Sequence, residues 1–326
     1  MKYHKVWSKS RRELFLACPR WWVIRYGINQ GNWDQSTSKK WYSMNDIRSY
    51  WDLMLRSSKQ TIFERLEDLQ MNVEWSQLYT ERRIRENLTD KLSRQQQIMS
   101  IHEIVGTKKA IDNNLELNNI DFEYLIKNAI KRINALWKTD FIQALINRYH
   151  KQWMVFERTE YGLVNGIDLY CCPDIAVKIQ NHWHLIRIDM QGSRDSCFEE
   201  LEAMAMVSWI KGKNNLPILA NKFIIRIIAW RNGFWNRQRF SSNENKLIQS
   251  KYLIESDINQ MQMMLSRLGD DNSMSQIPLA NKPSTCRKCA LRESCPGGSD
   301  LNVGISQQSA LELAEFIQTR DSKIAH

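Results

Sequence analysis

The 326-residue sequence lacks several features that would direct a protein into a membrane or make it a motor. No run of about 18 apolar residues occurs, so we expect no membrane-spanning helix and no membrane partner. The start of the chain has no apolar stretch of the kind found in secretory signals, so we expect a cytoplasmic protein. The motif G-x-x-x-x-G-K-[ST] is also missing, so any motor activity should come from a partner subunit.

Glycine and proline are scarce, at 12 and 6 residues in the whole chain, and no linker rich in either divides it. In residues 30–150, apolar side chains recur at helical spacing, which predicts a helical subdomain. Within it, residues 81–96 carry charges of both signs. This segment is either a solvated helix face or a stripe that follows a phosphate backbone, and its arginines are Arg82, Arg83, Arg85 and Arg94.

Positive charge is abundant. The chain has 46 Lys and Arg against 36 Asp and Glu, for a net charge of +10. This excess indicates a polyanionic partner, with nucleic acid as the first candidate, and a basic solvated surface as the alternative. Some of the 13 tryptophans are candidates for stacking on bases.

The residue pattern changes near Gln152, where β-branched and aromatic residues alternate with glycine and proline. It predicts four strands, at 152–158, 163–170, 174–179 and 184–190, followed by a helix at 195–211. Two further strands are predicted at 222–230 and 234–240. A helix is expected at about 253–268. This order describes a mixed sheet with a helix on one face, an α/β core.

Two acidic residues fall at the ends of predicted strands. A hairpin of residues 174–190 would bring Asp174 and Asp189 to one corner of the sheet. Two carboxylates at such a position can hold a divalent metal for phosphodiester chemistry. Asp168 is a rival for Asp174, but the shorter separation from Asp189 suits one tight hairpin.

Cysteines near both chain ends form a possible metal site. Cys286, Cys289 and Cys295 give C-x2-C-x5-C, and three cysteines within ten residues of an intracellular chain indicate a metal. Such a site needs a fourth ligand. Cys18, which precedes Pro19, is the natural candidate, because the other cysteines fall in the predicted sheet and helix.

This cysteine layout resembles that of the iron–sulfur branch of the PD-(D/E)XK nucleases, which includes RecB- and AddB-like nucleases and exonucleases of CRISPR adaptation. The resemblance implies a restriction-endonuclease-like core, a mixed sheet flanked by helices. It also implies a 4Fe–4S cluster that joins the chain ends, with zinc as the alternative, held by Cys18, Cys286, Cys289 and Cys295. The implied partners are single- or double-stranded DNA and a helicase or other motor subunit.

The resemblance also assigns roles at the acidic site. Asp174, Asp189 and the Met190 carbonyl would hold Mg²⁺ or Mn²⁺, and Gln191 stands where the family has its catalytic lysine. A neutral amide can hold a water but supplies no charge. Lys178 is a candidate for that charge, because an even offset from Asp174 places both on one face of the strand.

Further departures from the family accompany Gln191. Ala110 stands where the family has a histidine, and Glu200 and Met204 replace a glutamine and a tyrosine. We therefore expect a DNA-binding or DNA-processing subunit that is catalytically impaired or inactive. An active Mg²⁺- or Mn²⁺-dependent nuclease with a variant D-x-Q site is the alternative, and an interaction scaffold that does not bind DNA is a third class.

Four regions follow from these patterns: an N-terminal arm with the first cluster cysteine, a helical subdomain, the nuclease-like core, and a C-terminal region of helices and cysteines. Their expected bounds are 1–29, 30–150, 151–245 and 246–326.

Overall fold

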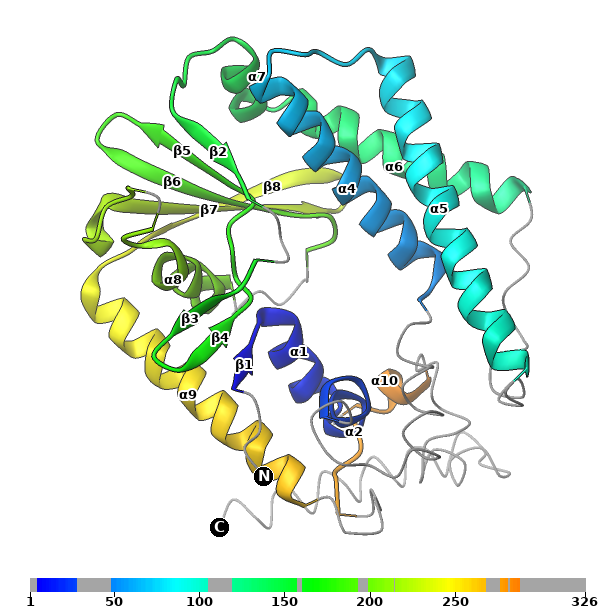
Figure 1. Cartoon of the computed structure of the whole chain (residues 1–326), viewed down its shortest axis with the longest axis vertical. Coiled ribbons are helices and arrows are strands. Elements are labelled where there is room, and N and C mark those ends of the chain that lie inside the picture. The colour runs from blue at the N-terminus through cyan, green and yellow to red at the C-terminus, as the bar shows by residue number, and fades with distance from the viewer. Residues whose placement is uncertain are drawn as a thin grey trace.

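The computed structural model describes residues 5–27, 48–104, 119–156, 160–192, 199–213, 215–267, 276–280 and 282–287. The fold is α/β, as expected, with a five-stranded sheet, a three-stranded sheet and helices packed on both (Figure 1). Of the residues named above, Ala110, Cys289 and Cys295 lie outside the described part.

The five-stranded sheet has the strand order β2-β5-β6-β7-β8. Neighbouring strands are antiparallel except β6 and β7, which are parallel and are connected through helix α8 (Glu199–Ile210). The strand bounds are β2 Trp153–Val155, β5 Ile175–Ile179, β6 His182–Asp189, β7 Phe223–Arg231 and β8 Phe234–Ser241. The predicted mixed sheet with a crossover helix is therefore confirmed.

Helices from the first half of the chain cover one face of this sheet (Figure 1). They are α4 Tyr50–Gln70, α5 Gln77–Ile104, α6 Asn119–Trp137 and α7 Asp140–Ile146. Ser49 caps α4 by accepting a hydrogen bond from the N–H of Asp52 at 3.1 Å. Ile62 of α4 shares a buried core with Ile186 and Ile188 of β6, so helices and sheet pack as adjoining layers. No helix in the described residues is both long and apolar enough to cross a membrane.

The other face of the sheet packs against α8 and α9 (Glu244–Ser266). Ala203 and Val207 of α8 share a core with Ile225 of β7. Helix α9 begins well before the expected residue 253, because the side chain of Asn243 caps it by accepting a hydrogen bond from the N–H of Lys246 at 2.9 Å.

The three-stranded sheet has the order β1-β4-β3 and corrects one prediction. Residues 163–170 were expected to form a single strand, but they contain β3 (Gly162–Val164) and β4 (Ile167–Leu169). Between them, Asn165 and Gly166 have φ angles of 52° and 75°. An Asn-Gly pair in this left-handed region makes a two-residue hairpin turn, and β4 then pairs in parallel with β1 (Val6–Trp7).

The N-terminal arm contains α1 (Lys9–Ala17), α2 (Pro19–Trp22) and the π-helix η1 (Val23–Gly27). Ser8 caps α1 by accepting a hydrogen bond from the N–H of Arg11 at 3.2 Å. The helix ends at Ala17 with Cys18 as its C-cap, because the residue before Pro19 disfavours the helical conformation. Phe15 and Trp22 pack with Leu265 of α9 and with Ile277. The arm therefore meets the C-terminal part of the described chain, which ends in α10 (Pro283–Arg287).

Candidate functional site

Asp174 and Asp189 lie at the same end of a hairpin formed by β5 and β6. The register pairs Ile175 with Ile186, so Asp174 comes just before β5 and Asp189 ends β6. The side chain of Asp174 is fully buried, and that of Asp189 is 29% exposed. The hairpin predicted from the sequence is present and brings both carboxylates to one end of the sheet.

Donors from α4 and β6 surround the Asp174 carboxylate. Arg187 donates from Nη1 to Oδ1 at 3.1 Å, and the N–H of Ile188 donates to Oδ2 at 2.5 Å. Lys59 of α4 donates from Nζ to the same Oδ2 and to the carbonyl oxygen of Ile188. Both oxygens of this buried carboxylate are thus engaged by protein donors, as a buried charge requires.

A line of alternating charge continues from Asp174 to Asp189. Arg187 Nε lies 3.1 Å from Glu202 of α8, and Lys9 Nζ of α1 lies 3.2 Å from Glu202 and 3.4 Å from Asp189. Burial would lower the pKa of Arg187 and of Lys9. The neighbouring carboxylates outweigh burial and raise the pKa of both above their ordinary values.

This arrangement does not fit a divalent metal at Asp174. A metal would need carboxylate lone pairs that here face Lys59, Arg187 and the N–H of Ile188. The side chain of Met190 is buried in the core on the helical side. In the part of the chain that the structure describes, no three His, Cys, Asp or Glu side chains gather as metal ligands. In this structure the Asp174 carboxylate binds the side chains of Lys59 and Arg187 instead.

Gln191 and Lys178 lie apart from Asp174. Gln191 Oε1 accepts a hydrogen bond from Nε1 of Trp51 in α4 at 2.6 Å, so its amide oxygen is turned toward a helix. Lys178 is exposed near the far end of β5. Four residues of strand, about 13 Å, separate it from Asp174. The lysine that contacts Asp174 is Lys59, from a different element.

Cys18 and Cys286 are the two predicted cluster ligands that the structure describes. Cys18 is buried between α1 and α2, where its Sγ accepts from the N–H of Trp21 at 3.4 Å. Cys286 is half-buried in α10. Arg20 Nε donates to the carbonyl of Ile277 at 2.6 Å, which ties α2 to the segment leading to α10.

Four members of the charged line were not expected from the sequence: Lys9, Lys59, Arg187 and Glu202. A signal existed for Lys59, which follows Leu55 by four residues and precedes Ile62 by three, on the apolar stripe of its helix. A signal also existed for Arg187, which interrupts an apolar strand. Lys9 and Glu202 carried none, because only the tertiary fold brings them together.

The opposite end of the sheet carries a basic pocket. A cavity of about 860 Å³ opens among β2, the β5–β6 turn and the loop before β7. Its lining includes Lys151, Lys178 and Lys222 together with Trp153 and Trp183, and none of its described lining residues is acidic. Ammonium groups beside tryptophan rings suit the phosphates and bases of a single nucleic-acid strand.

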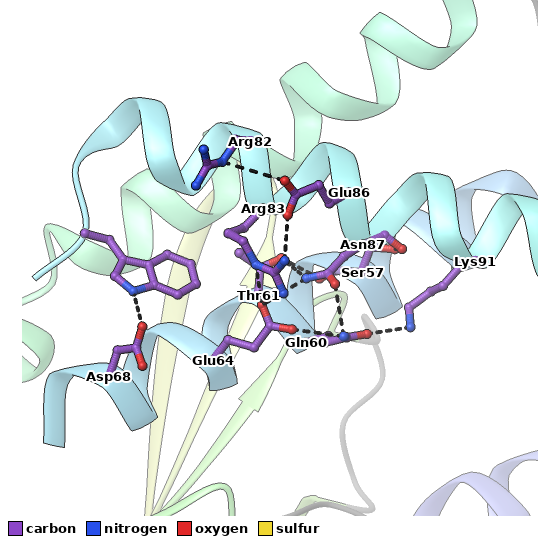
Figure 2. Close-up of polar contacts among 11 residues, drawn as sticks. Ser57, Gln60, Thr61, Glu64, Asp68, Arg82, Arg83, Glu86, Asn87 and Lys91 are labelled. Carbon is purple, nitrogen blue, oxygen red and sulfur yellow. Dashed lines mark hydrogen bonds and ion pairs between the residues drawn. The ribbon is translucent and has the colours of Figure 1, made fainter. Parts of the chain in front are cut away.

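The arginines of α5 have a different environment (Figure 2). Arg83 donates to Glu64 at 3.0 Å and to Glu86 at 2.6 Å, and Arg82 lies 3.6 Å from Glu86. Arg85 similarly pairs with carboxylates on α5 and α6. Since these arginines are matched by acids, the environment favours a solvated helix face over a phosphate-following stripe.

No family model and no curated protein sequence matches this chain. The charged line between Asp174 and Asp189 and the basic pocket are therefore the features from which a function is inferred.

Proposed function

We propose that this protein binds DNA through a RecB-like PD-(D/E)XK core whose acidic site is structural and catalytically impaired or inactive. The observation that carries this proposal is the buried Asp174, which Lys59, Arg187 and the N–H of Ile188 already satisfy. A buried ammonium balances the charge of a carboxylate. It cannot lower the pKa of a bound water as a divalent metal does.

The order of elements supports the nuclease-like core. Strands β2, β5 and β6 precede α8 and β7, and the two aspartates end the central hairpin. This is the arrangement that the resemblance implies. The fold class alone hosts many functions, so the functional part depends on the charged side chains.

Charge supports a DNA partner. The chain carries a net charge of +10, and the basic pocket combines three lysines with two tryptophans. Lysines that neutralise phosphates release counterions, so binding through them weakens steeply as salt increases.

The direct test is a titration of labelled single- and double-stranded oligonucleotides at several salt concentrations. We expect salt-sensitive binding, and the double substitution Lys178→Gln with Lys222→Gln should lower the slope of log affinity against log salt by about 1.4 for a single strand, or about 0.7 per lysine. Lys91→Gln on α5 is the matched control and should leave the slope unchanged. Wild-type protein without salt-sensitive binding would instead be a scaffold that does not bind DNA.

Lys9 favours a second candidate, the active nuclease. Its ammonium lies 3.4 Å from Asp189, so it supplies a positive charge beside the second motif acid that Gln191 does not. If the enzyme is active, Mn²⁺-dependent cleavage of labelled DNA should occur and be lost in both Lys9→Met and Asp189→Ala, with Lys91→Met as the control. The structural interpretation of the site predicts no such cleavage by the wild-type protein.

The cysteine cluster belongs to the same proposal. The contact of Arg20 with the Ile277 carbonyl supports it, because it ties the arm that carries Cys18 to the segment before Cys286. Anaerobically purified protein should contain iron and sulfide, and Cys18→Ser should lose both, whereas Cys171→Ala should keep them. Stoichiometric zinc without iron would establish the zinc alternative. A motor subunit remains the proposed protein partner.

A further inference from the structure

Three arginines gather on strands β7 and β8, on the face of the sheet away from Asp174. Arg226 of β7 lies directly opposite Arg239 of β8 in the register, and Arg237 is the next residue on the same face of β8. Like charges directly across an antiparallel pair destabilise a sheet. Such a pair needs a compensating negative charge.

The described residues provide little of that negative charge. Among the described residues, the one carboxylate that contacts this group is Asp140 of α7, 3.4 Å from Arg237, and the side chain of Asp140 is 95% exposed. Burial, followed by the charges of Arg239 and Arg237, lowers the pKa of Arg226. The group is therefore electrostatically unbalanced within the part of the chain that the structure shows.

A buried histidine provides a second, independent observation. His184 of β6 is 4% exposed, and its Nδ1 has no hydrogen-bond partner among the described residues. Burial, followed by Arg226, Arg239, His182 and His150, lowers its pKa to about 4. A buried polar nitrogen without a protein partner can accept a hydrogen bond from, or donate one to, a water, an ion or a ligand.

We propose that Arg226, Arg237 and Arg239, together with His184, form a binding site for phosphate groups, which the backbone of a nucleic-acid strand supplies. Guanidinium groups bind phosphate oxygens bidentately, and bound phosphates neutralise the positive charge that the protein leaves unmatched. Arg237 and Arg239 are two strand residues apart, about 6.7 Å, so they can contact successive phosphates of an extended strand.

The site is accessible to a large ligand. Strand β8 is at the edge of its sheet, Arg239 is exposed, and 41% of the Arg237 side chain is exposed. The choice of nucleic acid as the phosphate source depends on the proposed DNA-binding function. The phosphate site itself does not, because it follows from the arginines and His184 alone.

The test compares Arg226→Gln, Arg226→Lys and Arg239→Gln with Arg82→Gln, which removes an exposed arginine from α5. Without added anion, Arg226→Gln and Arg239→Gln should raise the unfolding temperature by roughly 1–2 °C, because they relieve repulsion. A merely structural arginine would lower it on removal. Arg226→Lys retains the repulsion and should show no such gain.

Added ligands then identify the phosphate source. Pyrophosphate at constant ionic strength should raise the unfolding temperature of the wild-type protein and of Arg82→Gln, but much less that of Arg239→Gln. Single-stranded oligonucleotides should bind Arg239→Gln about tenfold more weakly than wild type, with a salt slope lower by about 0.7. Both results together support a nucleic-acid phosphate site.

Other outcomes separate the two proposals. Stabilisation by pyrophosphate through Arg239, with no oligonucleotide binding by the wild-type protein, would support the phosphate site and contradict the DNA-binding function. Normal oligonucleotide binding by Arg239→Gln, with pyrophosphate stabilisation lost, would point to a free phosphate compound as the ligand. If pyrophosphate stabilises neither the wild-type protein nor Arg239→Gln, and oligonucleotides bind these two proteins equally, the proposed phosphate site is wrong.

Discussion

Arg187 and Arg226 lie on the neighbouring strands β6 and β7, one residue out of register and on opposite faces of the same sheet. The register pairs Arg187 with Ile227 and Arg226 with Ile186. Arg187 contacts the carboxylates of Asp174 and Glu202, whereas Arg226 lies opposite another arginine. Burial lowers the pKa of Arg187, but the neighbouring carboxylates outweigh burial and raise it. Burial and the neighbouring arginines both lower the pKa of Arg226.

The difference distinguishes Arg187, whose charge stabilises the fold, from Arg226, whose charge we propose binds a phosphate ligand. On the Asp174 face, the line from Asp174 through Arg187, Glu202 and Lys9 to Asp189 alternates in sign, so each of these charges has a neighbour of opposite sign. On the Arg226 face, Arg226 lies opposite Arg239, and the one described carboxylate that contacts the group is the exposed Asp140. A protein retains such unbalanced groups at functional sites more often than in its core.

Replacing each arginine by methionine should have very different effects on the two faces of the sheet. Arg187→Met should lower the free energy of unfolding by about 3–5 kcal/mol, because it leaves Asp174 and Glu202 buried without their shared cation. Arg226→Met should cause no loss, because it removes one of two repelling charges. Urea unfolding of both variants measures the difference.

A double-mutant cycle supplies the control. Arg187→Met combined with Glu202→Gln should recover part of the loss, because the second substitution removes one unmatched carboxylate. Equal losses in Arg187→Met and Arg226→Met would show that the two arginines are equivalent packing residues and would remove the distinction.

The strands on which these groups lie were predictable from sequence for a physical reason. Alternating β-branched residues and turn-forming pairs are local signals, and they placed the β5–β6 hairpin and both aspartates at its end. The Asn165–Gly166 pair is an equally local turn signal. It divides residues 163–170, which were expected to form one strand, into two strands of a second sheet.

The partners of the aspartates were not predictable in this way. Lys59 is 115 residues from Asp174, and Lys9 is 180 residues from Asp189. No local pattern encodes such a pairing, and a lysine on the apolar stripe of α4 indicates a buried partner without identifying it. The motif residues therefore predicted where the acids lie, and only the tertiary structure shows that protein cations engage them.

A smaller effect is expected in the pH dependence of stability, through His184 on the Arg226 face. The pKa of His184 is about 4, below its ordinary value of 6.5, so as the pH falls the unfolded chain takes up a proton before the folded protein does. Stability that is fully present above pH 6.5 should decline as the pH falls towards 4, by about 3 kcal/mol. Unfolding measured at pH 7.5, 5.5 and 4.5 in wild type and His184→Gln isolates this contribution.

Pyrophosphate tests whether that decline depends on the arginines. Bound phosphate would offset the charges of Arg226 and Arg239, so the pKa of His184 should increase and the decline should become shallower. An unchanged decline in saturating pyrophosphate, or an identical decline in His184→Gln, would contradict this description of the face.

The smallest expected effect concerns Arg83, an arginine outside both groups. Its side chain is 30% exposed and bonds to Glu64 and Glu86 between α4 and α5 (Figure 2). Exposed ion pairs contribute little, so Arg83→Gln should lower the free energy of unfolding by about 0.5–1 kcal/mol. Because its charge is already matched, oligonucleotide affinity and salt slope should stay at their wild-type values. A loss of affinity equal to that of Arg239→Gln would mean that the presence of matching carboxylates does not distinguish structural arginines from ligand-binding ones in this protein.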